Sequence, residues 1–358
     1  MIVKNESAVI TRCLTSVLPI IDYWVVVDTG SSDKTPKIIK EFMEKNKIPG
    51  ELHERPWINF GHNRDEALKL AKDKGDYIFF IDADNTFEYE PEFKLENLDK
   101  DFYYVTLSDA GTRYVRIALI KNSLNWEWVG VLHEAVCCPV AKTYSTLEKV
   151  TQLVRMDGSR SKDPKKYEKD AAVFEEALQK EPNNARYVFY LAQSYFDAKN
   201  YPMALKNYEK RVAMGGFDQE VFCSLLRIGK LQEKLKMSSE HLITTYNKAF
   251  QYRKTRVEPL YYLANIYRER EDFNKSYLIC KIAETIPPSQ DTLFVEQWIY
   301  DYGMPLELSI AAYWTERYEE SQKISQELLK KDLPDHVRPI VENNLGFANG
   351  KLLEKALE

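Results

Sequence analysis

Acidic residues at the ends of two apolar runs in the first third of the chain are the first candidates for chemistry. The triplet Asp82-Ala83-Asp84 directly follows the run Tyr77 to Ile81. Asp28 directly follows a second run, Tyr23 to Val27. Each run is typical of a buried strand, and open α/β sheets bind ligands beyond the carboxyl ends of their strands. Two neighbouring carboxylates at such a place can share one hard divalent cation. We therefore predict a Mg²⁺ or Mn²⁺ site at this triplet.

The segment Asp28 to Asp33 reads Asp-Thr-Gly-Ser-Ser-Asp and lies between a buried strand and a helix that begins near Thr35-Pro36. Its glycine, Gly30, allows a ligand to approach the backbone closely, and the N-terminus of the helix attracts phosphate or a ribosyl hydroxyl. The segment is a candidate nucleotide-binding turn. The alternative is a capped turn with no ligand.

The elements that must position these residues follow from the hydrophobic patterns of residues 1–140. Short β-like runs alternate with amphipathic helical patterns, which is typical of a sheet covered by helices. From residue 102 onward, β-like segments follow one another without helices, which favours an antiparallel extension. We predict an α/β nucleotide-binding domain with helices over 7–17, 35–42 and 61–72, and with strands over 23–27, 51–54, 77–81, 102–107, 113–120 and 131–137.

Beyond residue 160 the pattern becomes helical, and the stretch 158–164, rich in polar residues, Gly and Pro, predicts the junction. A set of large and small residues recurs after 72 positions: Leu191, Ala192, Tyr195, Tyr201, Ala204 and Tyr208 correspond to Leu263, Ala264, Tyr267, Phe273, Ser276 and Cys280. Two units of about 36 residues each are similar to tetratricopeptide repeats, which stack pairs of short helices. We predict one domain over 1–160 and a tetratricopeptide-like helical domain over 161–358, with a generic helical bundle as the alternative.

Composition excludes several classes of protein. With 50 Lys and Arg against 55 Asp and Glu, the net charge is −5, so nucleic acid is not an expected partner. No apolar run approaches the ~18 residues that cross a bilayer, and no secretory signal opens the sequence. The five cysteines form no C-x-x-C pair, which favours reduced thiols and a cytoplasmic location.

Four motifs, in order, resemble those of the family 2 glycosyltransferases, which have the GT-A fold. They are Lys4-Asn5-Glu6, the segment 28–33, Phe60 with Arg64, and the triplet 82–84. His133-Glu134, after Trp126 and Trp128, resembles a block found in a subgroup with C-terminal tetratricopeptide repeats. The resemblance implies an inverting transferase of the hexosyltransferase type that uses a nucleotide-sugar donor, usually a UDP-sugar.

The resemblance also implies roles for single residues. Asn5 and Glu6 line the nucleoside end of the donor pocket, and Asp28 contacts the uracil or the ribose. Arg64 faces the diphosphate, and Asp82 binds the ribose or, through water, the metal. Asp84 binds the metal, with His133 as a further ligand. Asp65 and Asn85 depart from the family pattern and change the local charge.

An inverting transfer needs a carboxylate that takes the proton of the attacking hydroxyl. Glu134 is one candidate, although a strand that points His133 into the site would turn Glu134 to the other face. Asp109 and Asp157, each in or next to a predicted turn, are the alternatives.

The sequence leaves the acceptor open, as a peptide, a protein or a glycan, and the helical repeats are expected to bind it or to form a homodimer. A different class of function is a catalytically degenerate scaffold that binds a nucleotide sugar and acts through its repeats. A nucleotidyltransferase would need a Gly-rich basic phosphate loop near the N-terminus, and the sequence shows none.

Overall fold

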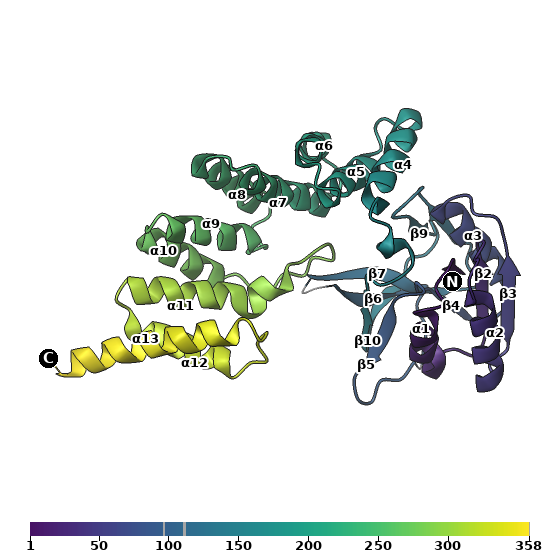
Figure 1. Cartoon of the computed structure of the whole chain (residues 1–358), viewed down its shortest axis with the longest axis horizontal. Coiled ribbons are helices and arrows are strands. Elements are labelled where there is room, and N and C mark those ends of the chain that lie inside the picture. The colour runs from purple at the N-terminus through teal and green to yellow at the C-terminus, as the bar shows by residue number, and fades with distance from the viewer. Residues whose placement is uncertain (96, 110–111, 358) are drawn as a thin grey trace. The chain divides into compact units, whose positions relative to one another are not determined.

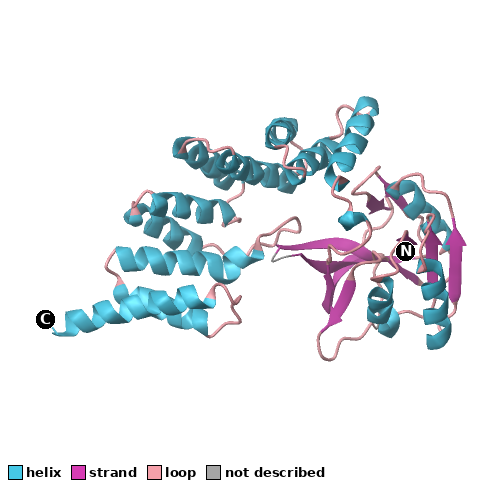
Figure 2. Cartoon of the chain, viewed as in Figure 1, coloured by secondary structure: helices cyan, strands magenta, loops and turns pink. Residues whose placement is uncertain are grey.

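The computed structural model describes residues 1–95, 97–109 and 112–357. The chain forms two compact units, Met1–Asn200 and Tyr201–Glu358 (Figure 1). Among the described residues, the strands lie in the first unit, and the second unit consists of helices joined by loops (Figure 2).

A parallel three-stranded sheet opens the first unit, with the strand order β1 (Ile2–Val3), β2 (Trp24–Asp28), β3 (Gly50–Glu54). The helices α1 (Ile10–Val17) and α2 (Thr35–Asn46) pack on this sheet. A short 3-10 helix, η1 (Leu18–Ile20), follows α1 directly. Proline in the first turn of α2 fits the start of a helix, since the missing N–H needs no partner there. A shared apolar core holds the layers together: Val3, Ile10, Leu14, Val26, Ile39 and Met43.

A mixed five-stranded sheet follows, in the order β4-β7-β6-β10-β5. Its strands are β4 (Tyr77–Phe79), β5 (Thr86–Tyr89), β6 (Phe102–Asp109), β7 (Thr112–Lys121) and β10 (Tyr144–Leu153). The helix α3 (Phe60–Leu70) precedes β4, and a small hairpin joins β8 (Glu127–Val129) to β9 (Ala135–Cys137). The pairs β4–β7 and β6–β7 are antiparallel, so the predicted antiparallel extension is confirmed.

The strands of the first unit differ from the expectation at several places. Strands β5, β8 and β10 were not expected from the sequence, although β10 pairs with both β5 and β6. The predicted strand 131–137 is shorter, because residues 131–134 form a turn and β9 begins only at Ala135. Gly130 has a φ of +115° and His133 a φ of +49°, which extended strands do not adopt.

Helices follow the last strand. After the 3-10 turn η2 (Arg160–Lys162), α4 (Lys166–Lys180) and α5 (Ala185–Asp197) pack on each other within the first unit. The second unit holds α6 (Tyr201–Met214), α7 (Asp218–Lys234), α8 (Ser239–Tyr252), α9 (Glu258–Glu269), α10 (Phe273–Glu284), the π-helical turn η3 (Ile299–Gly303), α11 (Met304–Trp314), α12 (Tyr318–Leu329) and α13 (Arg338–Leu357). From α6 to α13, each helix packs on the next.

The 72-residue repeat relates α5 to α9 and α6 to α10. Ala192 in α5 and Ala264 in α9 are fully buried, as are Ala204 in α6 and Ser276 in α10. Small residues at these positions let neighbouring helices approach closely. Together with the N-terminal α/β domain, this stacked array confirms the predicted fold class.

Among the described residues, no helix is long and apolar enough to span a membrane.

Candidate active site

Asp28, the last residue of β2, is buried and shapes the turn that follows it. Its Oδ1 accepts hydrogen bonds from the N–H groups of Gly30 at 2.9 Å and Ser31 at 2.8 Å. Gly30 has a φ of +99°, a conformation that side chains rarely adopt. The other oxygen, Oδ2, is buried and has no partner among the described residues. A buried acceptor left open in this way indicates a place for a ligand donor.

Asn5 and Glu6, which follow β1, are tied to the same turn. The N–H of Asn5 donates to Ser31 Oγ at 2.8 Å, and Asn5 Oδ1 accepts from the N–H of Ser32 at 2.7 Å. The carboxylate of Glu6 accepts from the N–H of Ser159 at 3.1 Å and 3.2 Å. Asn5 therefore shapes the turn, and Glu6 joins it to the segment after the sheet.

Asp82 lies between two arginines beyond the end of β4. Arg64 Nη2 is 2.5 Å from Asp82 Oδ1, and Arg116 Nη1 on β7 is 3.0 Å from Asp82 Oδ2. Burial alone would raise the pKa of Asp82, but the two guanidinium charges outweigh it and hold this pKa below its ordinary value. Asp82 is therefore a fixed anion within a charged network.

Arg64 extends this network to Glu134. Its Nε forms an ion pair with Glu134 Oε1, and its guanidinium lies 5.1 Å from the ring centre of Trp128. The side chain of Glu134 is only 7% exposed. The structure thus brings together Arg64, Asp82 and Glu134. From the sequence, Arg64 was expected to face the diphosphate and Asp82 to bind the ribose or the metal, and Glu134 was a candidate general base.

Asp84 has a different environment from Asp82. Among the described residues it has no basic ion-pair partner, while burial and the nearby charge of Asp82 raise its pKa. Gly158 lies so close that an added Cβ would come within 2.6 Å of Asp84 Oδ2. A carboxylate beside another anion is stabilised by a bound cation, so the chemistry of Asp84 fits a metal ligand.

The segment after β10 is fastened beside Asp84. Arg12 on α1 donates to both oxygens of Asp157 at 2.8 Å, and its Nη2 donates to the carbonyl of Asp84 at 2.9 Å. The hydrogen bonds from Arg12 lower the pKa of Asp157. Arg12 thus binds both oxygens of the Asp157 carboxylate. This contact gives Asp157 a structural role and leaves it less free to accept a proton.

His133 lies in the turn before β9 and not on a strand, which corrects the sequence interpretation. Its ring stacks on the buried Tyr190 of α5, with 4.3 Å between centroids, and its carbonyl accepts from Arg186 Nη2 at 2.9 Å. The residue as a whole is exposed. Desolvation and the nearby cations Arg160, Arg186 and Lys166 lower its pKa to about 3.

These surroundings of His133 bear on the predicted metal set. Among the described residues, no three His, Cys, Asp or Glu side chains converge on one point that could hold a metal ion. Cations near an imidazole also oppose a metal ion at it. The pairing of His133 with Asp84 remains a prediction.

Asp109 ends β6 and is partly buried, which raises its pKa. The charge of Lys166, at the start of α4, acts on both Asp109 and Asp84. The hydroxyl of Tyr114 on β7 is influenced by Asp109 and Asp82. Asp109 and Asp84 therefore both lie within reach of the charge of Lys166. Residues 110 and 111, the rest of its predicted turn, lie outside the described part of the chain.

Two basic residues of this region were not predicted. Arg116 is a single arginine within the apolar stretch of β7, a pattern that indicates a partnered buried charge. Lys166 is partly buried at the first position of α4, and burial, followed by the charge of Arg160, lowers its pKa. No feature of the sequence distinguishes Lys166 from its neighbour Lys165.

Four residues that the sequence singles out are structural. Trp126 donates from Nε1 to the carbonyl of Lys121 at 3.0 Å, and Trp128 packs on Phe80. Asp65 accepts from the N–H of Trp128 at 3.2 Å, and buried Asn85 accepts from that of Arg155 at 3.1 Å. Asp65 and Asn85, the two residues that depart from the family pattern, therefore form hydrogen bonds to the backbone of neighbouring segments.

The chain is similar to known proteins over parts of its length. Residues 1–106 match the family model of glycosyl transferase family 2. Over 117 residues the chain is 30% identical to the SPbeta prophage-derived glycosyltransferase SunS of Bacillus subtilis, which covers 32% of this chain. Over 85 residues it is 39% identical to a TPR repeat-containing protein of Synechococcus elongatus, which covers 24% of this chain. The chain spans 26% and 19% of the lengths of these two relatives.

Among solved structures, a tetratricopeptide repeat protein from Parabacteroides merdae is similar at a TM-score of 0.41 and 16% identity. The similarity covers 53% of this chain and 69% of that protein.

Proposed function

We propose that the protein transfers a hexose from a UDP-sugar to an acceptor hydroxyl with inversion, because residues 1–106 match the family model of glycosyl transferase family 2. The observation that carries the proposal is the pair of incompletely satisfied acids at two strand ends. Asp28 keeps a buried oxygen without a partner, and Asp84 lacks a basic partner, among the described residues. The first fits a nucleoside N–H or hydroxyl, and the second fits a cation at a diphosphate.

A divalent ion, Mn²⁺ or Mg²⁺, is part of this proposal. Asp84 would hold it, with Asp82 acting through water, and the ion would neutralise charge on the leaving diphosphate. His133 is retained as a further ligand only if its ring leaves Tyr190. Lys166, whose charge already acts on Asp84, is placed to attract the same diphosphate.

For the general base we propose Asp109 rather than Glu134. A base must be accessible and free to accept a proton. Glu134 is almost fully buried and already paired with Arg64. Asp109 is partly exposed, and its raised pKa brings it closer to that of a base at neutral pH. Glu134 then positions Arg64, and Arg64 in turn positions Asp82.

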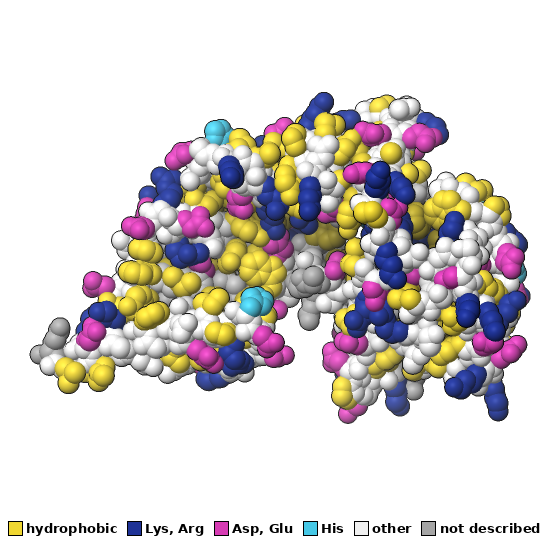
Figure 3. Space-filling model, viewed as in Figure 1, with side chains coloured by type: hydrophobic (Ala, Val, Ile, Leu, Met, Phe, Trp, Pro, Cys, Tyr) yellow, Lys and Arg dark blue, Asp and Glu magenta, His cyan; other side chains and the backbone are white. Residues whose placement is uncertain are grey.

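The helical array is proposed to bind the peptide, protein or glycan acceptor or to form a homodimer. Apolar side chains remain exposed on the last helix: Phe347 is 61%, Leu353 63% and Leu357 81% exposed. Figure 3 shows apolar side chains at this C-terminal end, and it shows basic and acidic side chains interspersed over the visible face. Light scattering of the full chain and of Leu353→Glu tests for a dimer that uses this helix.

A cytoplasmic location is part of the proposal, supported by five cysteines that are all free. Fractionation of the cells that express the protein would test it.

Calorimetric titration with UDP, with and without Mn²⁺, tests the function most directly. The expected result is binding that strengthens at least tenfold with Mn²⁺, together with slow hydrolysis of one sugar from a panel of UDP-sugars. Metal-dependent binding with neither hydrolysis nor transfer would favour the scaffold instead. If UDP does not bind either with or without Mn²⁺, both the transferase and the nucleotide-sugar-binding scaffold are wrong.

A further inference from the structure

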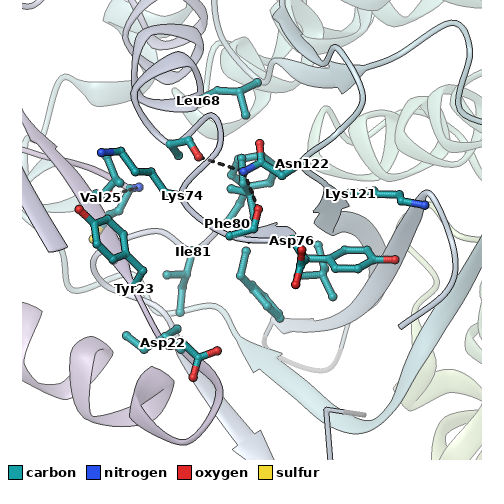
Figure 4. A pocket seen from close by; sticks show the side chains of 18 of the residues that line it. Asp22, Tyr23, Val25, Leu68, Lys74, Asp76, Phe80, Ile81, Lys121 and Asn122 are labelled. Atoms are coloured by element: carbon teal, nitrogen blue, oxygen red, sulfur yellow. Dashed lines mark hydrogen bonds between the residues drawn. The ribbon is translucent and has the colours of Figure 1, made fainter. Parts of the chain in front are cut away.

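A cavity of about 1120 Å³ in the first unit lies beside β4 and one face of α3 (Figure 4). Among its polar lining side chains, Asn122 donates to the carbonyls of Ala71 and Gly75, at 3.1 Å and 2.8 Å. Both hydrogens of this amide are therefore used within the fold. The second unit differs, because it holds a segment of the chain whose own backbone is bound by side chains, as that of a peptide ligand would be.

A long connection joins α10 to the turn η3 and α11. It covers residues 285–298, whereas the corresponding connection from α6 to α7 covers only 215–217. Helix–helix connections usually have about 2–8 residues, and a longer one without regular structure is commonly functional. Residues 289–294 of this connection have no regular structure, and we call them the strap.

Two arginines that precede α9 bind the carboxylate of the strap. Arg253 donates through Nε and Nη2 to both oxygens of Asp291, and Arg256 Nη1 donates to Asp291 Oδ2 at 3.0 Å. Burial alone would raise the pKa of Asp291, but these hydrogen bonds outweigh it and hold this pKa below its ordinary value. The strap therefore presents an anion to a pair of guanidinium groups.

Side chains of the helical array also bind the backbone of the strap. Arg256 donates from Nη1 to the carbonyl of Leu293 at 3.2 Å and from Nη2 to that of Phe294 at 3.0 Å. Gln219 Oε1, in the first turn of α7, accepts from the N–H groups of Thr292 at 3.0 Å and Leu293 at 2.9 Å. Every amino acid except proline offers the same main-chain groups, so another extended segment can make these contacts.

Both arginines are held in place by groups outside the strap. Arg256 is fully buried, donates to both oxygens of Glu258 at 2.7–3.0 Å, and lies 4.5 Å from the ring centre of Phe222. Arg253 Nη1 donates to Asp218 Oδ2 at 2.6 Å. Each arginine therefore keeps a carboxylate partner when the strap leaves. A site whose donors are positioned before the ligand arrives binds at a lower entropic cost.

The strap itself is only partly buried. Thr292 is exposed, and Leu293 and Phe294 are half-buried, whereas Val295, which follows the strap, is buried. Phe294 has a φ of +46°, a backbone conformation that bulky residues rarely adopt. Such strain persists only where the surroundings impose it, and a separate peptide does not share the constraint of the loop. The strap is therefore bound in a form that a separate peptide can replace.

We propose that the first turns of α7 and α9, together with Arg253 and Arg256, form a binding site for an extended peptide of a partner protein. The strap occupies this site when the partner is absent. The peptide carries an aspartate followed, two positions on, by two large apolar residues, as Asp291, Leu293 and Phe294 do in the strap. Its carboxylate binds the two arginines, and its backbone takes over the remaining contacts. The proposal concerns binding by the helical array and does not depend on glycosyl transfer.

The test uses the full chain and a fluorescein-labelled six-residue peptide with the sequence of the strap, Ser-Gln-Asp-Thr-Leu-Phe, ending in an amide. In the parent the strap competes at a high local concentration, so the peptide is expected to bind weakly. Asp291→Asn weakens the strap alone and is expected to strengthen peptide binding at least tenfold in fluorescence anisotropy. Gln290→Ala, at an exposed neighbouring position, is the matched control and is expected to bind as the parent does.

Two further measurements localise the bound peptide. The same peptide with asparagine in place of aspartate is expected to bind Asp291→Asn at least tenfold more weakly, because the arginines lose their anion. Adding Gln219→Ala to Asp291→Asn is expected to weaken binding of the original peptide at least fivefold, because two N–H groups lose their acceptor. Adding Gln322→Ala on α12 instead is expected to leave binding unchanged.

Hydrogen exchange in the parent tests the displacement without any variant. Saturating peptide is expected to quicken exchange at the amides of Thr292 and Leu293, because they lose the side chain of Gln219. Unchanged exchange there, or peptide binding that ignores both Asp291→Asn and the aspartate of the peptide, would overturn the site. So would a lack of saturable binding to folded Asp291→Asn at millimolar peptide.

Discussion

Arg64 Nη2 lies 2.5 Å from Asp82 Oδ1, so two residues expected to serve different parts of a donor site neutralise each other. Arg116 binds the second oxygen of Asp82 at 3.0 Å, and Glu134 pairs with the Nε of Arg64. Such a chain of ion pairs fixes its members in place, because removing one member leaves a partly buried charge without a partner. Asp84, outside this chain, is the acid of the triplet left open to a cation.

The first prediction concerns Asp84→Asn. The pKa of Asp84 is raised in the folded protein, so its charged form is disfavoured by folding at neutral pH. Removing the charge should therefore raise the melting temperature of the metal-free protein by a few degrees. The same change should abolish the effect of Mn²⁺ on UDP binding and lower transfer about 100-fold or more. Thermal denaturation and calorimetry with and without Mn²⁺ measure both effects.

The pH dependence of this effect has a definite sign. The melting temperature of Asp84→Asn should exceed that of the parent by less and less as the pH falls through the raised pKa of Asp84. The parent then carries a neutral acid at this position, as the variant carries a neutral amide. Asp82→Asn is the matched comparison and should lower the melting temperature, since it leaves Arg64 and Arg116 facing each other. Full Mn²⁺ dependence in Asp84→Asn would remove this residue from the metal site.

The second prediction separates the two candidate bases. Asp109→Asn should lower the transfer rate about 100-fold or more while UDP affinity stays within twofold, because a base acts on the acceptor hydroxyl. Glu134→Gln should instead weaken UDP binding and lower the melting temperature, because Arg64 loses a partner. Initial rates and UDP titrations of the two variants measure the difference.

A pH profile adds a second criterion. The base must be ionised, so the rate should rise with pH through the raised pKa of Asp109 and then level off. Asp109→Asn should lose this rise. If Glu134→Gln loses the rise and keeps its UDP affinity, then Glu134 is the base.

Much of the first unit could be predicted because buried parallel strands are continuous apolar runs. The run that became β2 is of this kind, and its acidic end marks the ligand edge of the sheet. Strand β10 could not be predicted, because Tyr144–Leu153 is mostly exposed and polar in its first half. Its partners, β5 and β6, are also distant in sequence, so no local pattern reveals the pairing.

The candidate site shows the same division. Sequence spacing singled out Asp28, Asp82 and Asp84 as candidates, because each follows an apolar run. It could not show that Arg64 and Arg116 would share Asp82, since ion pairs across strands and helices depend on three-dimensional register. It also treated His133 as a strand residue, because nothing local announces the left-handed backbone at a non-glycine position.

The third prediction concerns the stacked pair His133 and Tyr190. The side chain of Tyr190 is buried, with 7% of the residue exposed. Tyr190→Ala removes the ring that stacks on His133 and should lower the free energy of unfolding by about 3 kcal/mol. Tyr190→Phe retains the ring and should cost less than about 1.5 kcal/mol. Chemical denaturation measures the stability, and hydrogen exchange should quicken at residues 131–135 in the alanine variant alone. Unchanged exchange there would show that α5 does not hold this turn.

The last prediction concerns the helical array, where one glycine stands at a helix crossing. An added Cβ at Gly229 of α7 would lie 2.4 Å from Cε1 of Tyr246, a buried ring of α8. Gly229→Ala should therefore separate the two helices and destabilise the protein by about 1–3 kcal/mol, although alanine is the better helix former. Gly346→Ala is the matched control, because no atom lies within 4 Å of its added Cβ in α13. The free energy of unfolding of Gly346→Ala should rise by about 0.5–1 kcal/mol, because alanine has the higher helix propensity. Denaturant titration measures both, and a gain of stability in Gly229→Ala equal to that of the control would show that the crossing of α7 and α8 has room to spare.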